Sequence, residues 1–307
     1  MVETRPLGDS DLITPRLVLG GNVFGWTVSG GEAFRILDRF AEAGGTLVDT
    51  ADVYSSWVPG HSGGESESLI GEWLRRGGGK AGVATKVGYS DGLSAATIEA
   101  ACDASLRRLG VERIDLYYAH KDDAETPLEE TLGAFDRLVR AGKVKAIGAS
   151  NYSAQRLAEA LAISEQAGLA RYAVLQPEYN LMRRDRYEGS LQELCVERNI
   201  GVLPYFGLAS GFLTGKYRSK ADLGKSVRGG RMGDYLDARG LAMLAALDAV
   251  GAEAGATPAQ VALAWLAAQP GVTAPIASAT TLDQLEELLG VMALELSPAQ
   301  IQMLDAI

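Results

Sequence analysis

The sequence predicts an α/β fold, a closed (β/α)8 TIM barrel that begins with a short β-hairpin. Eight short runs rich in β-branched residues recur along the chain, segments with helical periodicity separate them, and no hinge-like linker divides the 307 residues. Alternating strands and helices are typical of a parallel sheet, and eight pairs suit a closed barrel better than an open doubly wound sheet. We therefore expect residues 1–307 to form one domain.

Each expected strand is a short apolar run bounded by turn residues. In chain order the strands are Arg16–Leu19, Thr46–Asp49, Gly82–Lys86, Ile114–His120, Val144–Ala149, Ala173–Gln176, Ile200–Tyr205 and Thr273–Ala277. The segments between them repeat apolar residues about every 3.6 positions, as amphipathic helices do. Three of these helices begin at capping residues, which are Ser94, Thr126-Pro127 and Ser153.

Two segments depart from a minimal barrel. Leu7–Arg16 is expected to form a hairpin that closes the bottom of the barrel. Phe206–Leu236, after the seventh strand, is rich in Gly, Lys and Arg and is far longer than the usual ~2–6 residues of a βα loop. Long βα loops on a barrel usually carry ligand contacts, so we expect this one to bind a ligand.

Charge and composition exclude several classes of protein. Lys and Arg total 29 against 39 Asp and Glu, a net charge of −10, which gives no general reason to bind nucleic acid or an anionic membrane. Cys102 and Cys195 lie far apart in helical stretches, as in a reduced, cytoplasmic protein. The chain lacks an N-terminal signal core and an apolar run of ~20 residues. No Cys/His spacing is typical of a metal site, so we expect no metal.

The candidate catalytic residues lie where strands end, because a barrel builds its active site at the carboxyl ends of its strands. Asp49, Lys86 and His120 end three of the runs, and the loop after Asp49 can turn Tyr54 over the mouth. Reduction of a carbonyl needs a proton donor, and a free tyrosine with a pKa near ~10 is a slow acid at neutral pH. Lys86, held by Asp49, would ease that proton release, and His120 would orient the carbonyl.

A series of motifs in order along the chain resembles the aldo-keto reductase superfamily, close to its bacterial and channel β-subunit-like branch. The motifs are Asp49-Thr50-Ala51-Asp52-Val53-Tyr54, Gly64-Glu65-Ser66-Glu67, Thr85-Lys86, residues 115–120, Gly148-Ala149-Ser150-Asn151, residues 176–181, residues 205–217 and Gln284-Leu285-Glu286-Glu287. The resemblance spans nearly the whole chain.

The resemblance implies a barrel that binds NADPH in an extended form without a Rossmann domain, with Tyr54, Lys86, Asp49 and His120 as its catalytic tetrad. Ser150, Asn151 and Gln176 match positions that hold the nicotinamide carboxamide, and Tyr205 matches the aromatic residue that stacks on its ring. All the cofactor positions that it implies are Asn22, Val23, Asp49, Ser150, Asn151, Gln176, Tyr205, Phe206, Gly207, Leu208, Ala209, Ser210, Lys216, Arg228, Ser278, Thr280, Gln284 and Glu287. Among them, Leu208–Ser210 with Lys216 matches the pyrophosphate segment, and Arg228 matches a basic phosphate contact.

Two positions differ from the family pattern. Many relatives have Lys or Arg where this chain has Thr280, and Asn where it has Leu288. Because some relatives with a small hydroxyl residue at the first position still take NADPH, NADPH is favoured over NADH.

Bland alternatives accompany these interpretations. Taken alone, a lysine such as Lys86 is usually a solvated residue at a strand end, and His120 could be a hydrogen-bonded histidine of the core. The glycines of residues 60–64 are typical of a flexible loop at the rim. Trp26 and Trp57 either line an apolar substrate pocket or pack on the rim.

Three functions stay open at this stage. The leading hypothesis is reversible reduction of a small carbonyl compound to an alcohol. The alternatives are a cofactor-binding sensor or interaction subunit with little turnover, and a phosphate-binding lyase or isomerase. The sequence leaves the substrate open, and it leaves open whether the chain is a monomer or a homo-oligomer.

Overall fold

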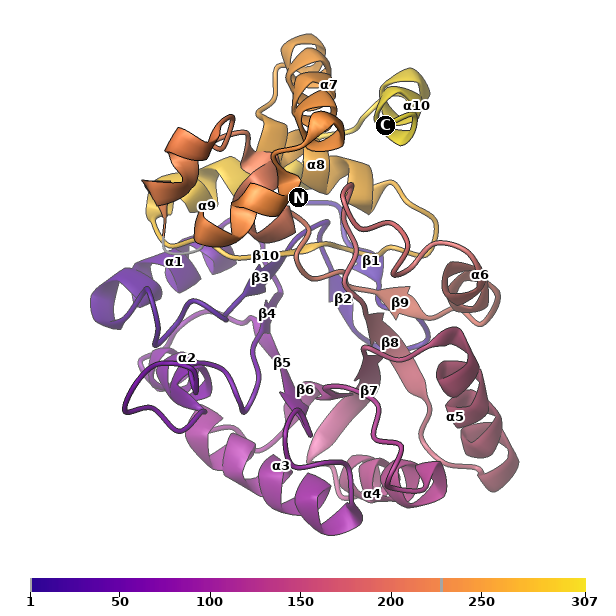
Figure 1. The fold of residues 1–307 in the computed structure, drawn as a ribbon. Helices are drawn as coiled ribbons and strands as arrows, with labels where there is room; N and C mark the ends of the chain where they lie inside the picture. Colours follow the sequence, from indigo (N-terminus) through magenta and orange to yellow (C-terminus); the bar gives the residue numbers. More distant parts are fainter. Residues whose placement is uncertain (1, 227–228) are drawn as a thin grey trace.

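Parallel strands arranged in a ring form the centre of the molecule, and helices surround them (Figure 1). The computed structural model describes residues 2–226 and 229–307. Within this part of the chain one eight-stranded sheet has the order β10-β3-β4-β5-β6-β7-β8-β9, and every neighbouring pair is parallel. Its strands are β3 (Val18–Gly20), β4 (Leu47–Asp49), β5 (Gly82–Val87), β6 (Ile114–Ala119), β7 (Val144–Ser150), β8 (Tyr172–Gln176), β9 (Gly201–Val202) and β10 (Ile276–Ala277). The (β/α)8 expectation is confirmed.

Backbone hydrogen bonds close the ring between its two end strands. Thr273 N donates to Val202 O at 2.9 Å, and Ile276 N donates to Pro204 O at 2.9 Å. β9 and β10 are shorter than the runs expected from the sequence. Pro204 and Pro275 explain the difference, because proline has no N–H to give to a sheet ladder.

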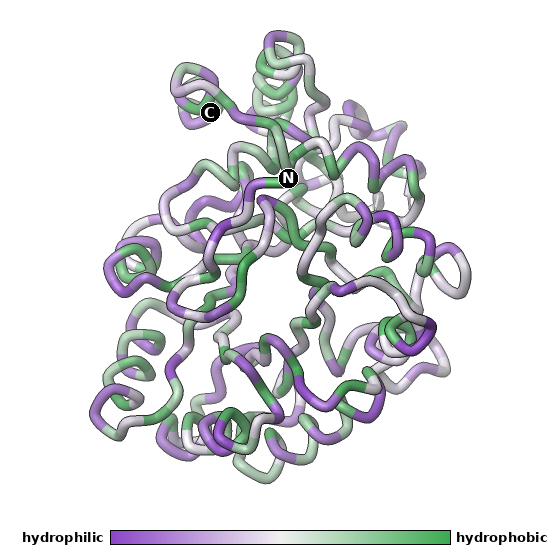
Figure 2. The backbone as a smooth tube through the Cα atoms, turned by 180° about the vertical axis from the view of Figure 1, so that it is seen from behind, coloured by the Kyte–Doolittle hydropathy of each residue, from purple (hydrophilic) through white to green (hydrophobic). Residues whose placement is uncertain are grey.

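The outer helices alternate with the strands. Along these helices, hydrophilic and hydrophobic residues alternate (Figure 2). Ser94 and Ser153 cap α3 and α5 as expected, each accepting a backbone N–H three residues ahead. The cap expected at Thr126-Pro127 is wrong: Pro127 is the N-cap of α4 without a side-chain bond, and the Thr126 hydroxyl donates to Asp123 instead. The helices are α1 (Gly30–Glu42), α2 (Glu65–Arg75), α3 (Ala95–Leu109), α4 (Leu128–Arg140), α5 (Ala154–Ala167), α6 (Ser190–Glu197), α7 (Ala238–Ala254), α8 (Pro258–Ala267), α9 (Leu282–Leu289), η4 (Gly290–Met292) and α10 (Pro298–Asp305).

The N-terminal hairpin closes the barrel at the amino ends of the strands. Its strands are β1 (Arg5–Pro6) and β2 (Ile13–Thr14), which pair antiparallel, so the hairpin starts two residues before the expected Leu7. Leu7 is fully buried in the apolar cluster inside the barrel. Gly8 has φ +58°, and a Cβ there would lie 2.3 Å from Ala173 O, so only glycine fits. The hairpin therefore fills the floor of the barrel.

The long segment after β9 contains three short 3₁₀ helices. They are η1 (Ala209–Thr214), η2 (Lys220–Lys225) and η3 (Gly229–Tyr235). The segment ends as expected, because Asp237 accepts the N–H of Gly240 at 2.7 Å and caps α7.

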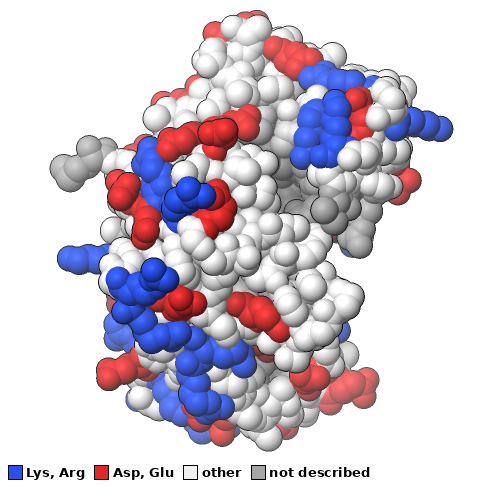
Figure 3. All heavy atoms as spheres, turned by 90° about the vertical axis from the view of Figure 1, so that its left-hand side faces the viewer, with Lys and Arg blue, Asp and Glu red and all other residues white. Residues whose placement is uncertain are grey.

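The surface carries both signs of charge. Figure 3 shows one face on which basic and acidic side chains are interspersed with large uncharged areas. In the described part of the chain, every helix is too short or too polar to cross a membrane.

Candidate active site

Lys86 is the centre of the polar cluster at the carboxyl ends of the strands. It is the fifth residue of β5, its side chain is fully buried, and its ammonium donates to Asp49 Oδ1 at 2.6 Å, to Thr50 O at 2.7 Å and to the Tyr54 hydroxyl at 3.0 Å. Asp49 holds the pKa of Lys86 above its usual range in spite of burial. Lys86 is thus a fixed buried cation.

Asp49, the last residue of β4, is 2% exposed and joins opposite walls of the barrel. Its second oxygen, Oδ2, accepts a hydrogen bond of 2.8 Å from the amide of Gln176 in β8, a strand four places away in the eight-stranded order. Burial raises the pKa of Asp49, and Lys86 opposes that rise. One N–H of Gln176 is therefore used within the protein, a role beyond the expected contact with a nicotinamide.

Tyr54 reaches the cluster from the loop that follows β4. The loop turns back through a bond from Tyr54 N to Ala51 O at 3.2 Å, which brings the phenol over Lys86, whose Nζ lies 4.7 Å from the ring centre. Burial raises the pKa of Tyr54 above its usual value, and the charge of Lys86 partly offsets that rise. The effect of Lys86 agrees with the expectation from the sequence, and the structure adds the opposing effect of burial. Tyr54 is a protonated phenol whose deprotonated form Lys86 stabilises.

His120 follows β6 and faces the same opening. Its ring centre lies 6.1 Å from that of Tyr54, and the side chain is 7% exposed. Burial, with Lys86 and Lys121 nearby, lowers the pKa of His120 to about 2. A neutral imidazole keeps one N–H donor, as an oxygen-orienting group needs.

A second set of polar side chains surrounds Asn151, which follows β7 in a left-handed conformation with φ 58°. Its amide donates to His120 O at 2.9 Å and to Ser150 Oγ at 3.1 Å, and its oxygen accepts from the Tyr205 hydroxyl at 2.8 Å. Ser150 Oγ in turn donates to Gln176 O at 2.7 Å. The four residues expected around a nicotinamide are therefore one connected network.

The expected pyrophosphate segment has an unusual backbone. Phe206, Ala209 and Ser210 have φ of 55°, 46° and 57°, three of the six non-glycine residues with positive φ in the described chain. Such residues cost about 1–2 kcal/mol each and gather at functional sites. Gly207 is packed so closely that a Cβ would lie 2.9 Å from Leu263 and Leu266.

Lys216 is the cation that the described structure offers next to this segment. Its side chain is exposed, its Nζ would lie 3.6 Å from a Cβ at Gly211, and no carboxylate of the described residues pairs with it. Arg228, the other expected phosphate contact, lies outside the described residues.

The remaining expected cofactor positions divide into two kinds. Ser278 Oγ donates to Asn22 Oδ1 at 2.7 Å, and Thr280 donates from N and Oγ1 to Gln284 Oε1 at 2.9 and 3.0 Å, so these polar groups lie in pairs. The side chain of Val23 is instead buried, and its carbonyl accepts three turn N–H groups.

At Glu287 the carbonyl accepts from Gln260 Nε2 at 2.8 Å. Leu288 is 3% exposed and packs in the apolar core.

The mouth is lined by aromatic side chains, of which the sequence argument named two. Trp57 is 49% exposed, with its ring 5.5 Å from Trp26 and 6.1 Å from Tyr54. Two further residues lie here that are not among those expected from the sequence. Tyr89 is 49% exposed with its ring 4.9 Å from that of His120, and the Nζ of Lys121 lies 5.2 Å over the Tyr89 ring. Both follow a strand end by two residues, the one signal that would have found them.

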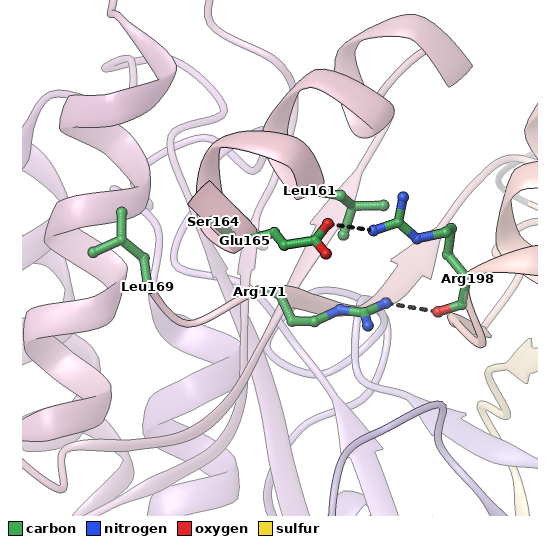
Figure 4. Close-up of a pocket in the computed structure, with 6 residues that line it drawn as sticks. All are labelled: Leu161, Ser164, Glu165, Leu169, Arg171 and Arg198. Atoms are coloured by element: carbon green, nitrogen blue, oxygen red, sulfur yellow. Dashed lines mark hydrogen bonds and ion pairs between the residues drawn. The ribbon is translucent and has the colours of Figure 1, made fainter. Parts of the chain in front are cut away.

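A hollow of about 200 Å³ lies elsewhere, beside α5 and the loop before β9 (Figure 4). Arg171 directly precedes β8 and so lies at the strand end opposite Gln176. In this hollow Arg171 donates to Arg198 O at 2.6 Å and pairs with Asp9 at 3.0 Å, while Arg198 pairs with Glu165 at 3.2 Å. With their charges already matched, these arginines hold helix, strand and hairpin together.

Known proteins resemble the chain over most of its length. The model of the Aldo/keto reductase family matches residues 16–307. A Bacillus subtilis (strain 168) protein named uncharacterized oxidoreductase YrpG is 34% identical, covering 100% of this chain and 96% of that protein.

Two further relatives differ in their names. A Schizosaccharomyces pombe protein named aldo-keto reductase yakc [NADP(+)] is 32% identical over 87% of this chain and 79% of its own. An Arabidopsis thaliana protein named probable voltage-gated potassium channel subunit beta is 33% identical over 93% of this chain and 90% of its own.

Proposed function

Since the chain belongs to the aldo/keto reductase family of oxidoreductases, we propose that it reduces an aldehyde or ketone to an alcohol with NADPH and that Tyr54 is the general acid. One observation carries the proposal: the Tyr54 hydroxyl lies 3.0 Å from the ammonium of Lys86, which is buried and paired with Asp49. A proton donor with a fixed cation beside its oxygen suits a reaction that generates an alkoxide.

The four residues divide the proton transfer among them. When bound, NADPH supplies a hydride to the carbonyl carbon. The neutral His120 donates a hydrogen bond to the carbonyl oxygen and orients it. The Tyr54 O–H bond breaks as its proton moves to that oxygen, Lys86 stabilises the phenolate that remains, and Asp49 holds Lys86 in place. Solvent then returns a proton to Tyr54.

The described residues fit a dinucleotide of this kind. The Asn151 network offers amide groups that can bind a carboxamide, and Tyr205 offers an aromatic ring beside it. The left-handed residues Phe206, Ala209 and Ser210 turn the main chain sharply in this segment, as in backbone sites that bind anions, and Lys216 supplies a cation for an anionic pyrophosphate.

Our preference for NADPH over NADH rests on the resemblance and on the NADP(+) in the name of the yeast relative. A titration of both cofactors, followed by tryptophan fluorescence, tests it. We expect NADPH to bind at least about tenfold more tightly, and equal affinities would contradict this preference.

The test of the mechanism is Tyr54→Phe, which deletes the hydroxyl and keeps the ring. We expect a fall in kcat of about 10²–10⁴-fold, the usual contribution of general acid catalysis, with NADPH affinity within twofold of the parent. Tyr187→Phe is the matched control, because it deletes a tyrosine hydroxyl that donates to Pro270 O and does not bond to Lys86. Reduction of a panel of aldehydes by the Tyr54 variant at the parent rate would show that Tyr54 is not the acid.

A second candidate function is a cofactor-holding subunit with little turnover. It is favoured by the similarity to the Arabidopsis protein named as a potassium channel subunit. Single-turnover oxidation of bound NADPH separates the two functions: an enzyme transfers hydride rapidly to at least one carbonyl compound, and a sensor transfers it slowly to all.

A further inference from the structure

We propose that the preferred carbonyl substrate has a flat apolar body bearing an anionic group, and that Tyr89 and Lys121 select it. This inference rests on the proposed function, because it names the substrate class of the same site. It concerns two residues that lie outside the tetrad and outside the cofactor positions.

The aromatic rings at the mouth form one continuous arc. Trp26 touches Trp57 edge-on at 5.5 Å, Trp57 touches Tyr54 at 6.1 Å, and beyond His120 the arc ends in Tyr89, 4.9 Å from the imidazole. Trp57, beside Tyr54, and Tyr89, beside His120, are each 49% exposed, so about half of each side chain is open to solvent. Flat apolar groups bind well to such surfaces.

Lys121 places a positive charge at one end of this arc. Its Nζ lies 5.2 Å from the centre of the Tyr89 ring, and that centre lies 4.9 Å from the centre of the His120 ring, so one aromatic ring separates the charge from His120. After burial and Lys86, the charge of Lys121 also contributes to the lowered pKa of His120.

No carboxylate of the described residues pairs with Lys121, although two follow it directly in the chain. Asp122 is engaged by Arg156 at 3.0 Å, and Asp123 accepts the N–H of Leu93 at 2.8 Å and the Thr126 hydroxyl at 2.7 Å. The protein thus satisfies both acids elsewhere and leaves the ammonium over Tyr89. In a protein of net charge −10, this cation gives the mouth a local preference for anions.

The tetrad cannot serve the same purpose. Lys86 is fully buried and held by Asp49, and His120 is neutral. An anionic group on the substrate would therefore find its partner in Lys121, with the body of the substrate against Tyr89 and the carbonyl between Tyr54 and His120.

Matched aldehydes test the proposal on the full-length protein. With NADPH, 4-carboxybenzaldehyde is compared with 4-carbamoylbenzaldehyde, which has the same shape without the charge. Because Lys121 is exposed, we expect kcat/KM to favour the carboxylate by about 2- to 5-fold, as for an ion pair at an exposed site. Lys121→Met should abolish the ratio and leave the carbamoyl compound within twofold, while Tyr89→Leu should raise KM for both aldehydes.

Lys145→Met is the matched control, because Lys145 donates to Asp11 O in the hairpin at the closed end of the barrel. This variant should keep the parent ratio. If the parent shows no preference for the carboxylate, or if Lys121→Met keeps it, the inference is wrong while the proposed function stands. If the parent reduces neither these aldehydes nor any other carbonyl compound, the proposed function itself fails, and the inference with it.

Discussion

Replacing Lys86 by methionine removes the cation that neutralises Asp49 and leaves the carboxylate 2% exposed with one remaining partner, the Gln176 amide. Breaking a buried ion pair from one side costs about 3–5 kcal/mol, because the other charge stays buried. Unfolding 307 residues changes the entropy by about 0.6 kcal/mol/K. We therefore expect Lys86→Met to lower Tm by roughly 5–8 °C, measured by circular dichroism, and to abolish turnover.

A double variant separates the buried charge from lost packing. Asp49→Asn with Lys86→Met removes both charges and keeps an oxygen for Gln176, so it should recover at least about 2 kcal/mol of the free energy of unfolding relative to Lys86→Met alone. If Lys86→Met unfolds within about 1 kcal/mol of the parent, Lys86 does not neutralise a buried charge and the ion-pair argument fails.

Two other perturbations address neighbouring residues. Because the pKa of His120 falls from about 6.5 when unfolded to about 2 when folded, its contribution to stability is present above pH 6.5 and is lost as pH falls; urea unfolding should show a loss of about 2 kcal/mol between pH 7 and pH 5. His120→Gln should reduce that loss, and an unchanged loss would refute the assignment. At Gly148, a Cβ would lie 2.6 Å from the Tyr118 ring, so Gly148→Ala should cost about 1–3 kcal/mol by thermal unfolding, and an unchanged Tm would show that the ring moves freely.

The sequence predicted the existence of the strands better than their limits. The runs rich in β-branched residues, separated by helical segments, suffice to predict eight strands, because β-branched side chains favour extended backbone. The end of a strand depends on hydrogen bonds to the neighbouring strand. The apolar runs predicted longer strands at β9 and β10, but Pro204 and Pro275 lack the N–H that would continue the pairing. The hairpin was likewise misplaced by two residues because Leu7 is a floor residue of the barrel and not the start of a strand.

At the candidate site, the residue types and their order along the chain predicted which side chains lie together. The structure added the hydrogen bonds that join them. The bonds of Lys86 to Asp49 and Tyr54 follow from two strand ends and one loop. The bond from Gln176 to Asp49 could not be predicted, since it depends on closure of the sheet. Tyr89 and Lys121 each lie two residues beyond a strand end, but their place beside His120 depends on the loops and is visible only in the structure.

The bond between Gln176 and Asp49 also has a mechanical meaning. It joins opposite walls of the barrel, tying β8 to β4 directly beside Lys86 and the proposed proton donor Tyr54. The barrel cannot widen here to admit a bulkier molecule without breaking the buried hydrogen bond from Gln176 to the Asp49 carboxylate. Changes in the accepted size of substrate must therefore arise in the loops above this bond, so this protein can acquire new substrates while its chemical machinery keeps its dimensions.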